Sequence, residues 1–150
     1  MKLKQIVALC ALASTAAVTQ AAPIWQDFSL TGLYGENYAV PFAGDDNKQT
    51  TITAEYAAGL KYGDFFAFAD RSNTDFGNET YFEVAPRLSL GAVTGQKLEL
   101  GPIKDVLIAT TWEGSASANT DFNNYLYGIG VDLAIPYFQY AQVNLYKADN

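Results

Sequence analysis

Apolar and polar residues alternate through the segment YFEVAPRLSL, residues 81–90. Successive side chains of a β-strand point to opposite faces of its sheet, so this alternation predicts a strand with two unlike faces. One face carries Phe82, Val84, Pro86, Leu88 and Leu90, and the other carries Tyr81, Glu83, Ala85, Arg87 and Ser89. The charged face meets bulk water if the apolar face covers a soluble core, or a water-filled lumen if the apolar face meets lipid.

The same two-residue period returns along most of the chain. In residues 51–62 an apolar row that ends in Tyr62 lies opposite Glu55 and Lys61, and in residues 125–133 a row that begins at Tyr125 lies opposite Asp132. Apolar rows with aromatic ends are typical of a lipid-facing barrel surface. The opposite faces mix charged residues with phenylalanine and tyrosine, which a soluble sandwich has less reason to do. The pattern therefore favours an all-β, antiparallel up-and-down transmembrane β-barrel over a soluble β domain.

Clusters of Gly, Asn, Asp and Pro divide the chain into predicted strands at 24–34, 49–62, 64–71, 79–90, 105–113, 123–133 and 136–147. Long polar connections at 35–48, 72–78 and 114–122 alternate with tight turns at 62–64 and 134–136, as in outer-membrane barrels. The connection 91–104 breaks this alternation, and we expect residues 97–100 to extend a neighbouring strand. Pro86 removes a ladder hydrogen bond in mid-strand, so a β-bulge is expected there. Gly128 and Gly130 predict close packing or bending of the strand.

Residues 1–21 have the features of a secretory signal peptide, which leaves 22–150 as the barrel domain. Lys2 and Lys4 precede an uncharged run, and small residues near Ala21 provide a cleavage signal. The run is too short for a membrane span, and the rest of the chain has no apolar stretch of about 18 residues. Cleavage takes the formal net charge from −7 to −9, because two lysines are lost, and it removes Cys10, the only cysteine.

The composition also excludes several function classes. The chain contains no histidine, which removes Ser-His-Asp and Cys-His catalysis and His-based zinc sites. A strongly acidic chain with scattered Lys and Arg offers no basic surface for a nucleic acid polymer. We therefore predict a protein that is not an enzyme, with no catalytic residue, no metal site and no cofactor.

The chain resembles the nucleoside-specific channel-forming proteins of the Gram-negative outer membrane, the Tsx-like family, in the segments TAEYAAGLKYGDFFAFAD, YFEVAPRLSLG, LELGPIKDVLIATTW and YLYGIGVDLAIP. The most specific pieces are Glu83–Ser89, where Ala85 stands in place of the family's second acid, and Gly101–Lys104. The resemblance covers most of the chain from about Trp25. It implies a barrel of about twelve strands, embedded in outer-membrane lipid and lipopolysaccharide, whose narrow lumen passes nucleosides and deoxynucleosides. In some members the outer loops bind phage or colicin. Family members continue for several strands beyond the position of Asn150, so we expect an incomplete barrel.

Nucleoside passage requires flat apolar surfaces for the base and hydrogen-bonding groups for the sugar. The predicted lumen face offers both. Its candidate ligand-binding residues are Glu55, Phe66, Phe68, Asp70, Tyr81, Glu83, Arg87 and Asp132. Each residue has a structural alternative. The charged residues can form a network in which Arg87 bridges to a carboxylate on a neighbouring strand, such as Asp70 or Glu55, and the phenylalanines can simply fill the barrel.

Two functions remain open from the sequence. The leading hypothesis is a passive outer-membrane channel, or porin, that is selective for nucleosides. The alternative is a non-transporting barrel that acts as a surface receptor for phage or colicin, or as a structural anchor.

Overall fold

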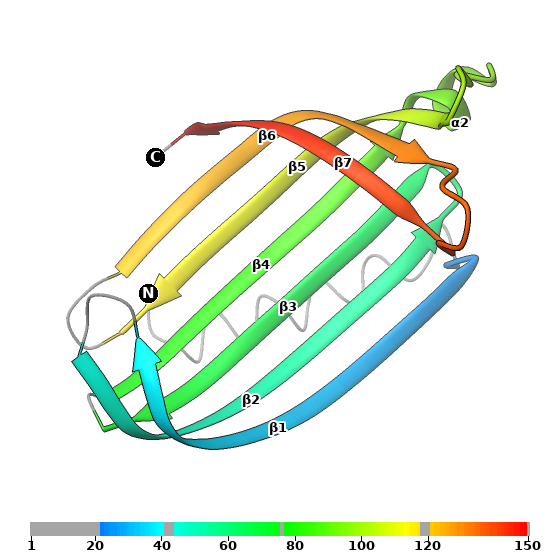
Figure 1. The fold of residues 1–150 in the computed structure, drawn as a ribbon. Helices are drawn as coiled ribbons and strands as arrows, with labels where there is room; N and C mark the ends of the chain where they lie inside the picture. The colour runs from blue at the N-terminus through cyan, green and yellow to red at the C-terminus, as the bar shows by residue number, and fades with distance from the viewer. Residues whose placement is uncertain (1–21, 41–43, 76, 118–120, 150) are drawn as a thin grey trace.

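The computed structural model describes residues 22–40, 44–75, 77–117 and 121–149, and the predicted signal peptide, residues 1–21, lies outside this part of the chain. One antiparallel sheet holds seven β-strands, each paired with the next along the chain (Figure 1). The strands are β1 (Trp25–Val40), β2 (Gly44–Leu60), β3 (Gly63–Thr74), β4 (Gly77–Ser89), β5 (Ile103–Ala116), β6 (Asp121–Leu133) and β7 (Ala141–Asp149). The predicted all-β, up-and-down order is confirmed.

The sheet is a single curved layer that wraps around a hollow, as in a partly closed barrel (Figure 1). Among the described residues the only buried apolar side chains are Ala58, Leu107 and Ala109. A β-sandwich would bury one face of each sheet against the other. The arrangement is instead that of a partly closed β-barrel. No helix in the described ranges is long and apolar enough to cross a membrane.

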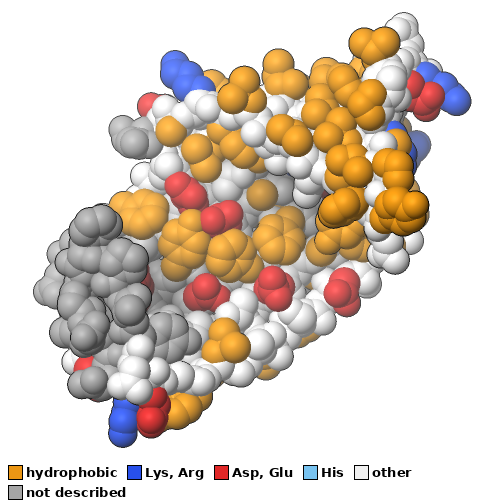
Figure 2. Space-filling view, viewed as in Figure 1, with side chains coloured by type: hydrophobic (Ala, Val, Ile, Leu, Met, Phe, Trp, Pro, Cys, Tyr) orange, Lys and Arg blue, Asp and Glu red, His pale blue; other side chains and the backbone are white. Residues whose placement is uncertain are grey.

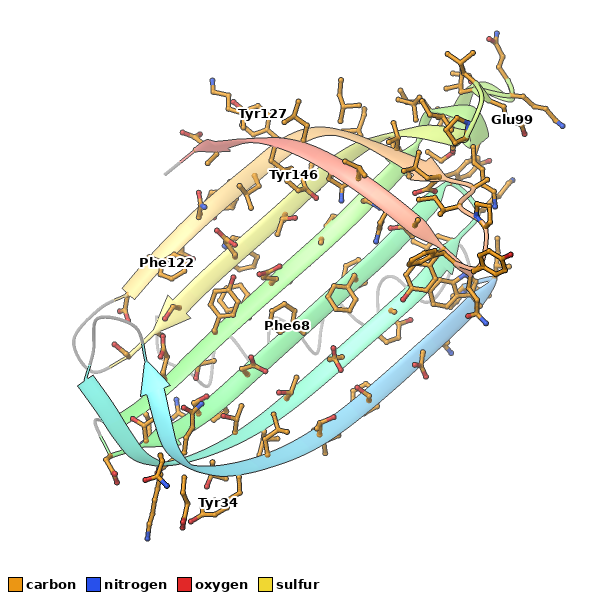
Figure 3. All side chains as sticks on the ribbon, in the orientation of Figure 1. Tyr34, Phe68, Glu99, Phe122, Tyr127 and Tyr146 are labelled. Atoms are coloured by element: carbon orange, nitrogen blue, oxygen red, sulfur yellow. The ribbon has the colours of Figure 1, made fainter. Side chains whose placement is uncertain are left out.

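The register of the strands assigns every side chain to a concave or a convex face. Glu55 pairs with Phe68, Phe68 with Glu83, and Glu83 with Glu113. Directly paired residues share a face, and Figure 3 shows that Phe68 points into the hollow. This row is therefore concave, and the adjacent residues, such as Trp112 next to Glu113, point outward.

The convex face carries a broad apolar band, and charged residues such as Glu36, Lys48 and Arg71 lie toward one end of the sheet. Its exposed side chains include Phe28, Leu30, Ile52, Leu88, Ile108, Trp112, Tyr125, Tyr127, Ile129 and Leu145. Figure 3 shows Tyr34 and Tyr127 pointing away from the hollow. Because the apolar band is outside while Glu55, Glu83 and Glu113 are inside, the outer surface is suited to lipid and the hollow to water.

The strands are longer than the sequence predicted at the end of the sheet that holds the β1–β2, β3–β4 and β5–β6 hairpins. Pairing continues to Val40 with Gly44, to Thr74 with Gly77 and to Ala116 with Asp121. The prediction of long loops at 35–48, 72–78 and 114–122 was therefore wrong. Cross-strand partners offset the weak strand propensity of these polar segments; Glu36 faces Lys48, and the amide of Asn73 donates to Asn78 at 2.7 Å.

The connection between β6 and β7 is also longer than the predicted tight turn. It runs from Leu133 to Ala141, so the expectation that the last strand begins at 136 was wrong. Phe138 N donates to Ile135 O at 3.1 Å and closes a turn. Tyr137, the third residue of this turn, has φ of 72°, a left-handed conformation that a bulky residue rarely adopts.

The connection between β4 and β5 contains a short helix, α2 (Leu90–Thr94). The Ser89 hydroxyl caps it by accepting from Ala92 N at 2.9 Å, and Asp105 accepts from Ser89 Oγ and from Gly91 N. The expected strand at 97–100 is reduced to one isolated bridge between Leu100 and Ile103.

Pro86 lies within β4 without the expected bulge. The pairs on either side join Val84 with Trp112 and Arg87 with Ala109, in one unbroken register. The prediction was wrong because the two strands keep their alignment across the missing N–H. The hydroxyl of Thr110 donates to the Pro86 carbonyl at 2.9 Å and replaces part of the lost ladder.

Candidate lumen site

Four aromatic side chains form a row across the concave face. Phe66 and Phe68 come from β3, Tyr81 from β4 and Phe122 from β6, with successive ring centroids 6.0, 5.7 and 6.2 Å apart. The small Ser115 of β5 lies opposite Tyr81, which lets Tyr81 and Phe122 meet across that strand. We call these four residues the aromatic row.

Carboxylates flank the aromatic row on both sides, and Figure 2 shows acidic side chains above and below a band of hydrophobic ones. They are Glu55 and Asp70 on one side and Glu83 and Glu113 on the other. The hydroxyl of Ser29 donates to Glu55 at 2.8 Å, and that of Thr53 donates to Asp70 at 2.6 Å. These neutral donors hold the carboxylates in place and leave their charge intact.

Tyr81 joins the aromatic row to two of these carboxylates. Its hydroxyl lies 2.5 Å from Glu83 Oε1 and 3.1 Å from Glu113 Oε2. Asn124 Nδ2 donates to Glu113 Oε1 at 2.6 Å, while Asn124 Oδ1 is buried without a hydrogen-bond partner in the described structure. The network fixes the plane of the Tyr81 ring and keeps two carboxylates side by side at the wall of the lumen.

Arg87 forms a second cluster, about 13 Å along β4 from Glu83. Its Nε and Nη2 donate to the two oxygens of Asp64 at 2.8 and 2.6 Å, and Nη2 lies 3.0 Å from Asp132 Oδ1. The expected bridge from Arg87 to a carboxylate on a neighbouring strand is confirmed, but the suggested partners, Asp70 and Glu55, were wrong. Asp64 is the residue directly opposite Arg87 in the register of β3 and β4, so it is the nearest carboxylate.

Small residues let Arg87 reach across β5 to β6 and β7. Ala109 lies opposite Arg87 and is fully buried, and Gly128 lies opposite Ala109. A Cβ atom at Gly130 would lie 2.3 Å from Asn144 Oδ1, the atom that also lies 3.5 Å from Arg87 Nη1. The close packing predicted for these glycines is confirmed.

The sequence placed all eight candidate residues on the correct face, but the structure separates them into two groups. Six lie in or beside the aromatic row, and Arg87 and Asp132 belong to the second cluster. Sequence reasoning missed Glu113 and Phe122, although each shares its strand's parity with a concave residue, Asp105 and Asp132 respectively. In the described ranges, no three His, Cys, Asp or Glu residues are grouped to hold a metal ion.

Sequence comparison identifies the family of this barrel. A family model described as "Nucleoside-specific channel-forming protein, Tsx" matches residues 24–149. The chain belongs to the Tsx family. Membership places the protein in the Gram-negative outer membrane.

Two curated relatives support the same location. The outer membrane protein OmpK of Vibrio parahaemolyticus serotype O3:K6 (strain RIMD 2210633) is 28% identical over 166 aligned positions, and a second OmpK from Vibrio parahaemolyticus is 29% identical over 163. Each alignment covers 95% of this Tsx-family chain and 60% of the relative, so the chain spans about 60% of the relatives' length. No solved structure matches the chain.

Proposed function

We propose that this Tsx-family chain contributes to a passive channel through which nucleosides and deoxynucleosides diffuse across the outer membrane. The nucleobase stacks on the aromatic row, and the sugar hydroxyls donate to the flanking carboxylates. No covalent chemistry and no cofactor are involved. The convex face contacts outer-membrane lipid and lipopolysaccharide.

The observation that carries this proposal is the aromatic row with carboxylates on both of its sides. Stacking on an aromatic side chain contributes about 1–3 kcal/mol per base and tolerates different bases, because every base has a flat face. Carboxylates accept hydrogen bonds and cannot donate them, so they match the hydroxyl donors of ribose or deoxyribose. A solute with one flat end and one hydroxyl-rich end fits both parts of this surface at once.

Phe68→Ala is expected to weaken nucleoside binding by about 5- to 150-fold, the equivalent of losing one stacking contact. Phe68 lies between Phe66 and Tyr81 in the row, so its removal interrupts the stacking surface at its centre. The measurement is the block of ion current by adenosine or thymidine across planar bilayers that contain the full-length protein.

Phe65→Ala is the matched control, because Phe65 lies on the convex face of the same strand. Its ring packs against that of Tyr56, with the ring centroids 6.0 Å apart. It should leave the nucleoside block unchanged. Equal block in both variants would show that the aromatic row does not hold the base. Current that is indifferent to every nucleoside would remove the substrate assignment and leave a barrel of another function.

The receptor alternative concerns the outer connections, whose tips at 41–43, 76 and 118–120 lie outside the described residues. A deletion strain separates the two functions. Slow growth on limiting nucleoside supports the channel, whereas normal nucleoside uptake with lost phage adsorption supports the receptor.

A further inference from the structure

Negative charge is distributed along the whole concave face. Every strand from β1 to β6 places at least one carboxylate there by its register. The residues are Asp27, Glu55, Asp64, Asp70, Glu79, Glu83, Asp105, Glu113 and Asp132. A solute that travels along the hollow is therefore near acidic groups over its full path.

Arg87 is the only Lys or Arg at a paired concave position in the described strands. Its side chain is 8% exposed, whereas those of Asp64 and Asp132 are 28% and 35% exposed. The guanidinium thus lies against the wall beneath two carboxylates that are more accessible than it is. Its positive charge is neutralised locally and is not presented to the hollow.

The other carboxylates have no such compensation among the described contacts. The hydrogen-bond donors that reach them are all uncharged: the side chains of Ser29, Thr53, Tyr81, Ser89, Ser115 and Asn124, and the backbone N–H groups of Gly91 and Val106. Hydrogen bonds from neutral donors favour the ionised form of a carboxylate and do not cancel its charge. Within the described part of the chain, the ion pairs of the concave face all contain Arg87.

We propose that the channel is selective for cations because its described wall carries carboxylates without compensating cations, and that Asp64 and Asp132 preserve this selectivity by neutralising Arg87. The solutes favoured are small inorganic cations and molecules that carry an ammonium group; anions are disfavoured. A pore lined by one sign of charge, with walls of low dielectric constant, concentrates ions of the opposite sign. The inference rests on the proposed channel function but does not depend on nucleosides being the solute.

The test is the zero-current potential of the full-length protein in a planar bilayer under a KCl gradient, with no nucleoside present. We expect a K⁺ to Cl⁻ permeability ratio several-fold above one. A ratio of one or less would overturn the proposal, and nucleoside block in the same channels would still support the proposed function.

Asp64→Asn combined with Asp132→Asn removes both partners of Arg87 and exposes its charge, so the permeability ratio should fall to about one or below. Glu55→Gln combined with Asp70→Asn removes the same number of charges but leaves the Arg87 pairs intact, so the ratio should fall less. Equal falls would overturn the role assigned to Arg87.

A single variant covers the case in which the first double variant does not fold. Asp132→Asn alone keeps the Asp64 pair and should give a smaller fall in the permeability ratio, in the same direction. An unchanged ratio would count against the proposal. Arg71→Gln, on the convex face, should leave the ratio unchanged.

Discussion

Ile129→Arg is expected to destabilise the folded protein in a bilayer and to lower the fraction that refolds into it. Ile129 is 62% exposed on the convex face, midway along the apolar row of β6 that runs from Tyr125 to Leu133. An arginine near the midplane of a barrel's lipid face costs about 2–4 kcal/mol, a large part of an ordinary folding free energy of about 5–15 kcal/mol. The measurement is the folded fraction after refolding into lipid vesicles, read from the heat-dependent gel mobility of folded barrels.

Two variants separate the effect of charge from the loss of the side chain. Ile129→Ala removes the same apolar contacts without adding charge and should fold. Leu126→Arg places the same charge three residues away on the concave face, where water hydrates it, and should fold as well. Normal folding of Ile129→Arg would contradict the assignment of the convex face to lipid.

The division of the sheet into two faces could be predicted from the sequence because it depends on one property of the strand. Side chains alternate with a period of two, and a shift of one residue would turn Glu83 and Arg87 toward lipid while Leu88 turned inward. Exposing these two charges to hydrocarbon would cost several kcal/mol. The alternation of apolar and polar residues is therefore well marked in the sequence. The same alternation in residues 51–62 and 125–133, together with the turn-forming clusters between segments, predicted the number and order of the strands.

Strand ends could not be predicted in the same way. Whether Glu36 and Asn73 lie in a strand depends on Lys48 and Asn78 across the hairpin, and these partners are not visible within one segment. The polar residues of these extensions look like loop residues when each segment is considered alone. At Tyr137 the opposite error arose, because an aromatic residue with high strand propensity adopts a turn conformation.

The candidate site shows the same limit. Parity placed its residues on one face, but the distances between them depend on how neighbouring strands are aligned. Arg87 pairs with Asp64 because the two are directly opposite each other on β4 and β3. It reaches Asp132 on β6 because Ala109, on the intervening strand β5, has a small side chain that leaves room on the concave face. Both conditions involve several strands at once. The aromatic row likewise required the register that brings Phe122 next to Tyr81.

Gly128→Ala is expected to detach β7 from the sheet. A Cβ atom at Gly128 would lie 1.8 Å from the carbonyl oxygen of Leu145 and 2.9 Å from its carbonyl carbon, and both are backbone atoms of β7. Backbone cannot rotate away as a side chain can, so the pairs of β6 with β7 must separate. Overpacking of this kind costs about 1–3 kcal/mol and more where the backbone must move, and we expect the upper end, about 3 kcal/mol. The measurement is the urea midpoint for unfolding of the vesicle-bound protein.

Gly32→Ala is the control for the change from glycine to alanine itself. No atom lies within 4 Å of a Cβ built at Gly32, so its urea midpoint should correspond to a change of no more than about 0.5 kcal/mol. A Gly128→Ala midpoint equal to that of Gly32→Ala would mean that Gly128 does not lie against the β7 backbone. In that case the register that pairs Gly128 with Tyr146 would be wrong. The contact between Arg87 and Asn144 would then be lost with it, because Asn144 reaches Arg87 only in this register.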